Sequence, residues 1–192
     1  MIKVTQLALL FLLMSACTLK QPESDWHTNS WNLVPAQSQL SFVTTKNKTI
    51  SEEHTLKFKS GMFDDSGFKL TVNLNTIDTQ IPIRDERMKE MLFETDDFPL
   101  ATITGQIPAG LNMGQTAELT FVLDLHGIQQ EMLAEVMIQQ VDGQLVVTNF
   151  EPITVNAKDF DLDHGVNELT RVAQLQSINY EVLVDFKLVF EM

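Results

Sequence analysis

The side chains of this sequence that could bind a metal ion are its histidines and one run of aspartates. No two of the four histidines lie at the spacing that zinc ligands require: His27, His54, His126 and His164. Residues 159–165, Asp-Phe-Asp-Leu-Asp-His-Gly, resemble a calcium-binding loop, but the glycine comes one position late and Thr170 stands where a bidentate glutamate is needed. We interpret this segment as a solvated acidic turn, with calcium binding as the less favoured alternative.

Two closely spaced arginines could bind an anion. Arg84 and Arg87 would lie on one short helix, where two guanidinium groups could grip a phosphate. Alternatively, they pair with the neighbouring carboxylates Asp85, Glu86 and Glu90 and so fix the helix over the rest of the fold. We favour the second interpretation.

The common catalytic motifs are absent from the sequence. It contains no G-x-S-x-G, no Walker loop, no G-x-G-x-x-G and no H-E-x-x-H. Its 26 acidic residues make some close pair of carboxylates inevitable, yet nothing marks one pair as a glycosidase-like dyad. We therefore predict that the protein is not an enzyme, holds no metal and needs no cofactor.

The elements that position these side chains are mostly strands, and the clearest lies in residues 68–76. Apolar residues on one side of it alternate with polar residues on the other: Phe68, Leu70, Val72 and Leu74. After Pro82, residues 84–93 are good helix formers with apolar side chains three and four residues apart, which predicts one short helix. Pro99 ends that helix, and residues 100–104 begin another strand.

The same alternation recurs in other stretches. It is seen in Leu40 with Phe42, Leu56 with Phe58, residues 119–125, residues 132–138 and residues 182–190. His126-Gly127 and Asp142-Gly143 mark turns between the strands. The sequence therefore predicts an all-β fold of about eight antiparallel strands with one short inserted helix. Periodicity alone leaves a closed barrel and a two-sheet sandwich as alternatives.

Several motifs of the middle of the chain match a known family. They are Thr76-Ile77-Asp78-Thr79, Arg84-Asp85 with Arg87-Met88, Phe98-Pro99 and Leu125-His126-Gly127-Ile128, with a supporting Trp31-Asn32-Leu33. On these residues the chain resembles the YceI family of secreted bacterial proteins, from Trp31 to the C-terminus. The resemblance implies a lipocalin-like, eight-stranded antiparallel barrel whose apolar cavity holds a polyisoprenoid or isoprenoid-quinone chain.

The resemblance and the alternation together predict which side chains line such a cavity. Without the resemblance, the same apolar residues would be read as an ordinary packed core. The predicted lipid-binding residues are Phe42, Phe58, Phe68, Leu70, Val72, Leu74, Met88, Met91, Phe121, Leu123, Met132, Val136, Phe186 and Leu188.

The N-terminus predicts export and anchoring. Residues 1–16 carry Lys3 and then a short apolar run, which suits a signal peptide and is too short to span a bilayer. Residues 13–17 resemble a lipobox ending at Cys17, the single cysteine of the chain, so we expect Cys17 to be acylated, for example with palmitate. Residues 17–30 read as a polar tether and residues 31–192 as one domain. Thr18 after the cysteine favours the outer membrane, facing the periplasm.

The charge of the chain excludes one class of partner. The formal net charge is −13, and loss of Lys3 with the signal would make it one unit more negative. Such a chain repels nucleic acid and anionic lipid headgroups. We therefore expect no nucleic-acid partner and membrane contact through acyl chains, and we leave a homodimer open.

These features together predict a membrane-tethered envelope lipoprotein that carries or sequesters a long isoprenoid without catalysis. One alternative is an envelope enzyme or accessory factor acting on a lipid-linked substrate, with His54, His126 and Asp78 as the residues to test. Another is a structural module whose barrel is solidly packed. The volume of the interior separates the carrier from the module, because ligand pockets measure several hundred Å³.

Overall fold

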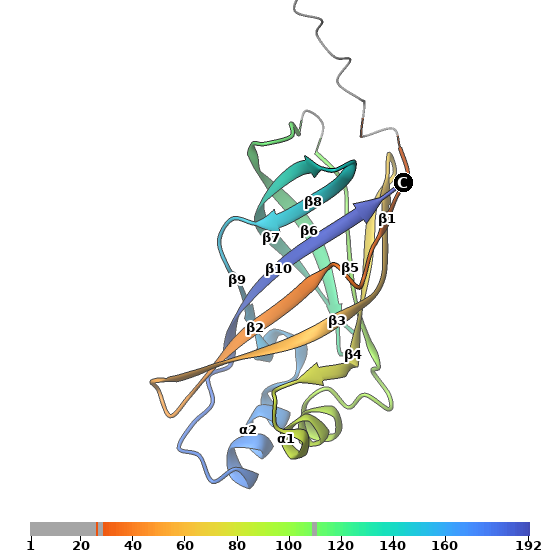
Figure 1. Ribbon diagram of the computed structural model, residues 1–192. Coiled ribbons are helices and arrows are strands. Elements are labelled where there is room, and N and C mark those ends of the chain that lie inside the picture. Colours follow the sequence, from red (N-terminus) through yellow and green to blue (C-terminus); the bar gives the residue numbers. More distant parts are fainter. Residues whose placement is uncertain (1–25, 27–28, 109–110) are drawn as a thin grey trace, which may run out of the picture.

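The computed structural model describes Trp26, residues 29–108 and residues 111–192. The expected signal peptide, Cys17 and most of the expected tether therefore lie outside the described residues. The part that is described forms one antiparallel sheet of ten strands that curls into a barrel, with helices at one end (Figure 1). No helix in this part of the chain is long and apolar enough to cross a membrane.

The barrel closes through its last strand. Its strands are β1 (Trp31–Leu33), β2 (Gln39–Lys46), β3 (Ile50–Asp64), β4 (Gly67–Asp78), β5 (Leu100–Gly105), β6 (Thr116–Leu125), β7 (Ile128–Val141), β8 (Gln144–Asn149), β9 (Ile153–Asn156) and β10 (Glu181–Glu191). Strands β2 to β8 follow one another as an antiparallel meander. Strand β10 pairs with β2 and β1 on one side and with β9 and β8 on the other, so its hydrogen bonds join the two ends of the sheet. The predicted lipocalin-like, all-β barrel is confirmed.

Tight turns connect the strands where the sequence predicted them. Both residues of His126-Gly127 and both residues of Asp142-Gly143 have positive φ angles, between 51° and 83°. This conformation matches the twist of paired antiparallel strands, which is why such pairs form two-residue hairpins. Asn47 and Lys48 also have positive φ angles, but they lie in a three-residue connection between β2 and β3, which was not predicted from the sequence.

The predicted helix is present. Helix α1 (Pro82–Arg87) runs directly into a π-helical turn, η2 (Met88–Leu92), after which the chain returns to the sheet as β5. Proline in the first turn of α1 fits its role there, because its missing N–H would be unpaired anyway. Strand β4 extends two residues past the predicted end at Thr76.

A second helix contradicts the interpretation of residues 159–165 as a solvated turn. A 3-10 turn, η3 (Ala157–Phe160), leads into α2 (Asp163–Val172), and Phe160, Leu162 and Val166 are buried. Leu162, Val166 and Leu169 form an apolar stripe with helical spacing, and this pattern is consistent with the helix that the structure shows. No group of three or more potential metal-binding side chains occurs among the described residues, which also disfavours the calcium loop.

Aromatic side chains pack at the end of the barrel opposite to the helices. Trp31 stacks on Phe63, and Trp26 and Phe190 each meet the same ring edge-on at 6.0 and 5.3 Å between centroids. Trp31 Nε1 donates a hydrogen bond of 2.9 Å to the backbone oxygen of Trp26. Trp26 is only 5% exposed, so the folded domain reaches at least to Trp26, inside the segment expected to be a tether.

Candidate functional site

A cavity of about 550 Å³ occupies the inside of the barrel. Inward side chains of the strands form its wall, and α1, η2 and α2 contribute to the lining at the end that Figure 1 shows below the sheet. This volume is in the range of ligand pockets. The interior is therefore not solidly packed.

Most of the predicted lipid-binding residues do line this cavity. The ones that do so are Phe42, Phe58, Phe68, Leu70, Val72, Leu74, Met88, Phe121, Leu123, Met132, Val136, Phe186 and Leu188. They come together because inward residues alternate along every strand of a barrel, so the period of two selected the correct face.

Met91 is the exception, because it is not among the described residues that line the cavity. In the helical segment, Met88, Leu92 and Phe93 face the cavity instead. The backbone oxygen of Met91 lies against Gly165 of α2, so this part of η2 faces the neighbouring helix. The sequence could not show that a second helix would cover this side of the segment.

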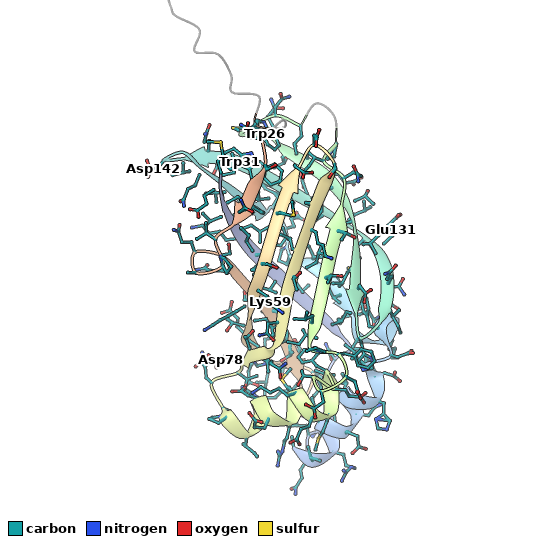
Figure 2. The ribbon with its side chains drawn as sticks, turned by 90° about the vertical axis from the view of Figure 1, so that its right-hand side faces the viewer. Trp26, Trp31, Lys59, Asp78, Glu131 and Asp142 are labelled. Carbon is teal, nitrogen blue, oxygen red and sulfur yellow. The ribbon has the colours of Figure 1, made fainter. Side chains whose placement is uncertain are left out.

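The cavity is apolar along most of its length and closed by aromatic residues at one end. Trp26, Phe63 and Phe190 form that end, together with Leu111. Figure 2 shows Trp26 and Trp31 at the top of the barrel, far from α1 and from Asp78. A long apolar chain could therefore lie along the barrel with its tail towards the aromatic end.

The polar residues of the lining gather at the opposite end, which we call the mouth. They are Thr44, Lys46, Glu52, His54, Arg84, Arg87, Asn179 and Tyr180. They come from the tip of the β2–β3 hairpin, from α1 and from the segment before β10, which meets the hairpin through a hydrogen bond from Asn179 N to the Thr45 oxygen (2.9 Å). Lys46, Glu52 and Arg84 are each about a quarter to a third exposed, so solvent reaches the mouth.

Glu52 joins the hairpin to α1. Its Oε2 accepts from Lys46 Nζ at 2.7 Å and from Arg84 Nη1 at 2.8 Å. The hydrogen bond from Lys46, helped by the charge of Arg84, holds the pKa of the Glu52 carboxyl below its usual range against a smaller opposing effect of burial. The carboxylate is therefore ionised at neutral pH.

A second set of hydrogen bonds fixes the start of α1. Arg84 Nη2 donates to the Thr79 oxygen at 2.7 Å, and Asp85 Oδ1 accepts from both the backbone N–H (2.8 Å) and the hydroxyl of Thr79. The preferred interpretation of Arg84 was thus right about anchoring the helix and wrong about the partner. Arg84 pairs with Glu52, 32 residues away, whereas the nearby pair on this helix is Lys89 with Glu86.

His54 is buried in the cavity wall and is 3% exposed. Its Nε2 lies 2.9 Å from Thr44 Oγ1, and its ring meets Phe42 edge-on at 5.4 Å. Burial lowers the pKa of His54, and the positive charge of Arg84 acts in the same direction. His54 is therefore a neutral, polar part of the wall near the mouth.

The other residues named for a catalytic alternative lie apart from His54. His126 contacts the Phe98 ring at 4.2 Å between centroids, and its Nε2 lies 3.4 Å from Glu94 Oε2. Asp78 is exposed, and its Oδ1 accepts a hydrogen bond of 2.8 Å from Gln80 N. Within the described part of the chain, neither His126 nor Asp78 lines the cavity.

Several lining residues were not predicted from the sequence, although its pattern could have placed them. Leu162, Val166 and Leu169 of α2 have helical apolar spacing that could have revealed them. Thr44 and Lys46 continue the inward alternation that begins at Leu40 and Phe42, so the strand pattern could also have placed them in the barrel. The pairing of Glu52 with Arg84 had no sequence signal.

Comparisons with known proteins show which family this fold is similar to. The model of the YceI-like domain matches residues 31–190. A polyisoprenoid-binding domain from Saccharophagus degradans, implicated in plant cell wall breakdown, is 30% identical with a TM-score of 0.78, over 84% of this chain and 97% of that one. BcnA from Burkholderia cenocepacia shares the fold at 16% identity and a TM-score of 0.63, over 82% and 98% of the two chains. None of the curated proteins matches. The chain belongs to the YceI family.

Proposed function

We propose that this protein is a membrane-tethered lipoprotein of the bacterial envelope that binds a long-chain isoprenoid or isoprenoid quinone in its barrel. It carries or sequesters this lipid and does not transform it. The cavity of about 550 Å³ with a continuous apolar wall is the observation that carries the proposal. The family, and the polyisoprenoid-binding domain that shares 30% of its residues with this chain, support the choice of ligand class.

The physical basis of binding is the removal of apolar surface from water. Each methylene group buried contributes about 0.8 kcal/mol, so a chain of many isoprene units can bind tightly with few polar contacts. Ordering a flexible chain opposes binding. A preformed barrel lowers the part of that cost that falls on the protein, because the wall is built from paired strands and does not have to assemble around the ligand.

The absence of catalysis in this proposal rests on where the reactive side chains lie. His54 is in the cavity wall, but His126 and Asp78 lie outside the lining, so the candidate residues do not meet around one point. The charged residues at the mouth hold one another and α1, as the Glu52 contacts show. Such groups suit recognition of a ligand's polar end.

A bulky residue in the cavity tests this function. Ala134 is buried in the wall, and its neighbour Leu133 points outward and is 54% exposed. We expect the detergent-free protein to copurify with lipid, or to take up an added polyprenyl lipid, in native mass spectrometry followed by lipid extraction. Ala134→Phe fills part of the cavity and should reduce uptake at least about tenfold, equivalent to 1.4 kcal/mol.

Leu133→Phe is the matched control, because it adds an aromatic ring on the outer face of the same strand. It should take up lipid as the unmodified protein does. Finding only apoprotein that also refuses added polyprenyl lipid would contradict the proposed function. Equal uptake by Ala134→Phe and Leu133→Phe would show that the lipid binds elsewhere.

A further inference from the structure

A slot opens in the side of the barrel between β7 and β9. Strand β8 pairs with β7 and with β10, but beyond Pro152 the chain continues as β9, which among the described strands pairs with β10 alone. Residues 128–135 of β7 are therefore paired with β6 on one side and face the slot on the other. Residues 130–135 line the slot together with most of β9, and the slot encloses about 540 Å³. A space of this size is in the range of ligand pockets.

The edge of β7 that borders the slot has unpaired backbone groups. Phe150 N donates to the Glu135 oxygen at 2.7 Å, so the backbone groups of Glu135 point away from β6. In an antiparallel ladder this direction alternates from residue to residue, so the backbone groups of Glu131 and Leu133 also point away from β6, into the slot. Within the described residues, no backbone hydrogen bond joins them to β9. Such an edge is a template for pairing with another chain.

The facing edge of β9 is open as well. Ala157 N donates to the Tyr180 oxygen at 2.8 Å, so the backbone groups of Ala157 point towards the β10 side. By the same alternation, those of Thr154 and Asn156 point away from β10. Both residues line the slot. The slot therefore has free donors and acceptors along both of its long sides.

The open stretch has the length of a short strand. It is bounded at one end by the hydrogen bond from Gln130 Nε2 to the Asp159 oxygen (3.0 Å) and at the other by the bond between Phe150 and Glu135. Residues 130–135 span about 16 Å at about 3.3 Å per residue. Strands of about three to ten residues are usual in proteins. An extended segment of another chain can therefore add to these edges as a strand, which is the recognition mode called β-augmentation.

The slot is acidic. No lysine or arginine of the described chain lines it, whereas five of its lining residues carry a carboxylate: Glu131, Glu135, Glu151, Asp159 and Glu181. None of these five forms an ion pair with a described residue. Figure 2 shows Glu131 on the outside of the barrel, where an approaching chain would meet it. Unpaired charges of one sign around an open edge attract a segment of the opposite sign.

We propose that this slot receives an extended, basic segment of a partner protein as an added strand between β7 and β9. The backbone of the segment pairs with Glu131 and Leu133, and its outward lysine or arginine side chains meet the five carboxylates. Its inward side chains are apolar, because the floor of the slot consists of Met132, Ala134 and Ile153, which also line the lipid cavity. The partner segment thus alternates basic and apolar residues. The assignment is independent of the proposed function, because the strand edges need no lipid in order to pair.

Two other occupants match the slot less well. A second copy of this chain has a formal net charge of −13, so its approach to an acidic edge is opposed by repulsion. Residues 17–25 of the chain itself contain one lysine and two acidic residues, and so also lack the required charge. The charge of the slot therefore favours a different, basic protein.

Amide hydrogen exchange, followed residue by residue by NMR on the full chain, tests whether the edge is open. The amides of Glu131 and Leu133 should exchange at least about tenfold faster than those of Gln130 and Met132, which bond to β6. The probe is then a synthetic nine-residue peptide in which lysine alternates with valine. Its binding should slow the exchange of Glu131 and Leu133, and also that of Thr154 on the facing edge.

Two peptides of the same length separate backbone pairing from charge. One has glutamate in place of lysine, and the other keeps the lysines but is N-methylated at every second residue, which removes the donors along one edge. Fluorescence anisotropy gives the dissociation constants. Each change should weaken binding at least about tenfold, and higher salt should weaken the binding of the unmodified peptide. Failure of the unmodified peptide to bind, or equal binding of the methylated or the acidic peptide, would overturn the proposal.

A pair of double variants locates the binding. Glu131→Gln with Glu181→Gln should weaken binding of the basic peptide at least about tenfold. Glu53→Gln with Glu191→Gln is the matched control, because it also removes two exposed carboxylates but none from the slot, and it should bind as the unmodified protein does.

An equal loss in both double variants would show non-specific attraction to an acidic surface and would overturn the site. Slow exchange at Glu131 and Leu133 without peptide would show that the edge is already paired, with the same consequence. Sedimentation equilibrium tests the remaining occupant. A dimer that dissociates as the peptide binds would assign the slot to a second copy of this chain and not to a basic partner.

Discussion

At the scale of the residue, the pKa of His54 depends on its burial and on the charges near the mouth of the cavity. Burial is the main cause that lowers its pKa below the ordinary value of 6.5, with Arg84 adding to it, and the negative charges of Glu52 and Asp85 and the Glu53 carbonyl opposing it. The unfolded chain therefore binds a proton at His54 more readily than the folded one. Lowering the pH should therefore lower the free energy of unfolding, because His54 is protonated more readily in the unfolded chain.

We predict that the free energy of unfolding falls as the pH decreases through 6.5, where unfolded His54 becomes protonated first. His54→Gln should show a shallower fall between pH 7.5 and 5.5, measured by chemical denaturation at several pH values. Glu52 contributes at lower pH, since its carboxylate loses its stabilising effect only as the pH falls below about 4.5. An identical pH dependence in both proteins would contradict this role of His54.

Among single residues, the sequence predicted the apolar wall better than the polar mouth. Alternation along a strand fixes which side chains share a face, so the pattern alone was enough to place Phe42 or Leu188 inward. The partner of Arg84 could not be found in this way, because nothing in the local pattern links α1 to a glutamate 32 residues earlier in the chain.

At the scale of elements, α2 and η2 pack closely against each other at the mouth end of the barrel. Gly165 of α2 lies so close to η2 that a methyl group there would clash with the Met91 oxygen and with Cα of Leu92. These are backbone atoms, so the neighbour cannot move aside easily. A glycine is therefore required by close packing and not by its backbone angles.

We predict that Gly165→Ala destabilises the protein by about 1–3 kcal/mol, as other substitutions that overfill a packed site do. The sign of this change in stability distinguishes the two cases, because alanine in an unobstructed helix would stabilise the protein by roughly 0.5–1 kcal/mol relative to glycine. Urea denaturation of the two proteins measures the difference.

His164→Ala is the control, because His164 is exposed in the same helix. We expect its effect to remain within about 0.5 kcal/mol. A Gly165→Ala protein as stable as His164→Ala would show that the two helical segments are less closely packed than this contact implies.

At the scale of the whole molecule, the mouth and the N-terminal end of the domain lie at opposite ends of the barrel. Trp26 packs against Phe63 at the aromatic end, whereas α1 and α2 surround the mouth (Figures 1 and 2). A tether that precedes Trp26 would thus join the barrel at its closed end. The proposed anchor would leave the mouth free to exchange lipid with a partner or with another membrane.

We predict that Cys17→Ser releases the protein from the membrane fraction. Acyl chains each contribute about 0.8 kcal/mol per buried methylene, and serine cannot carry them through a thioether. Cell fractionation and the intact mass of the mature protein give the result. Equal membrane association of both proteins, or an unmodified Cys17, would contradict the anchor. Lipid uptake by the released Cys17→Ser protein should stay unchanged, since the cavity lies within the domain.

The sequence by itself determined the local features of this protein. Strand alternation, the two glycine turns and the proline-bounded helix all depend on neighbours within a few residues, and each was predicted correctly from them. The same information selected the inward face of nearly every strand. Family motifs, which are also local, then favoured the barrel over the sandwich.

Tertiary structure alone decided whether the interior is open and where its charges meet. Apolar alternation is the same for a filled core and for a hollow barrel, because it records which way side chains point and not how far apart opposite walls stand. Likewise, the contacts of Glu52 with Arg84 and of Gly165 with η2 join segments far apart in the sequence, so they form only when the barrel closes and brings its helices to one end.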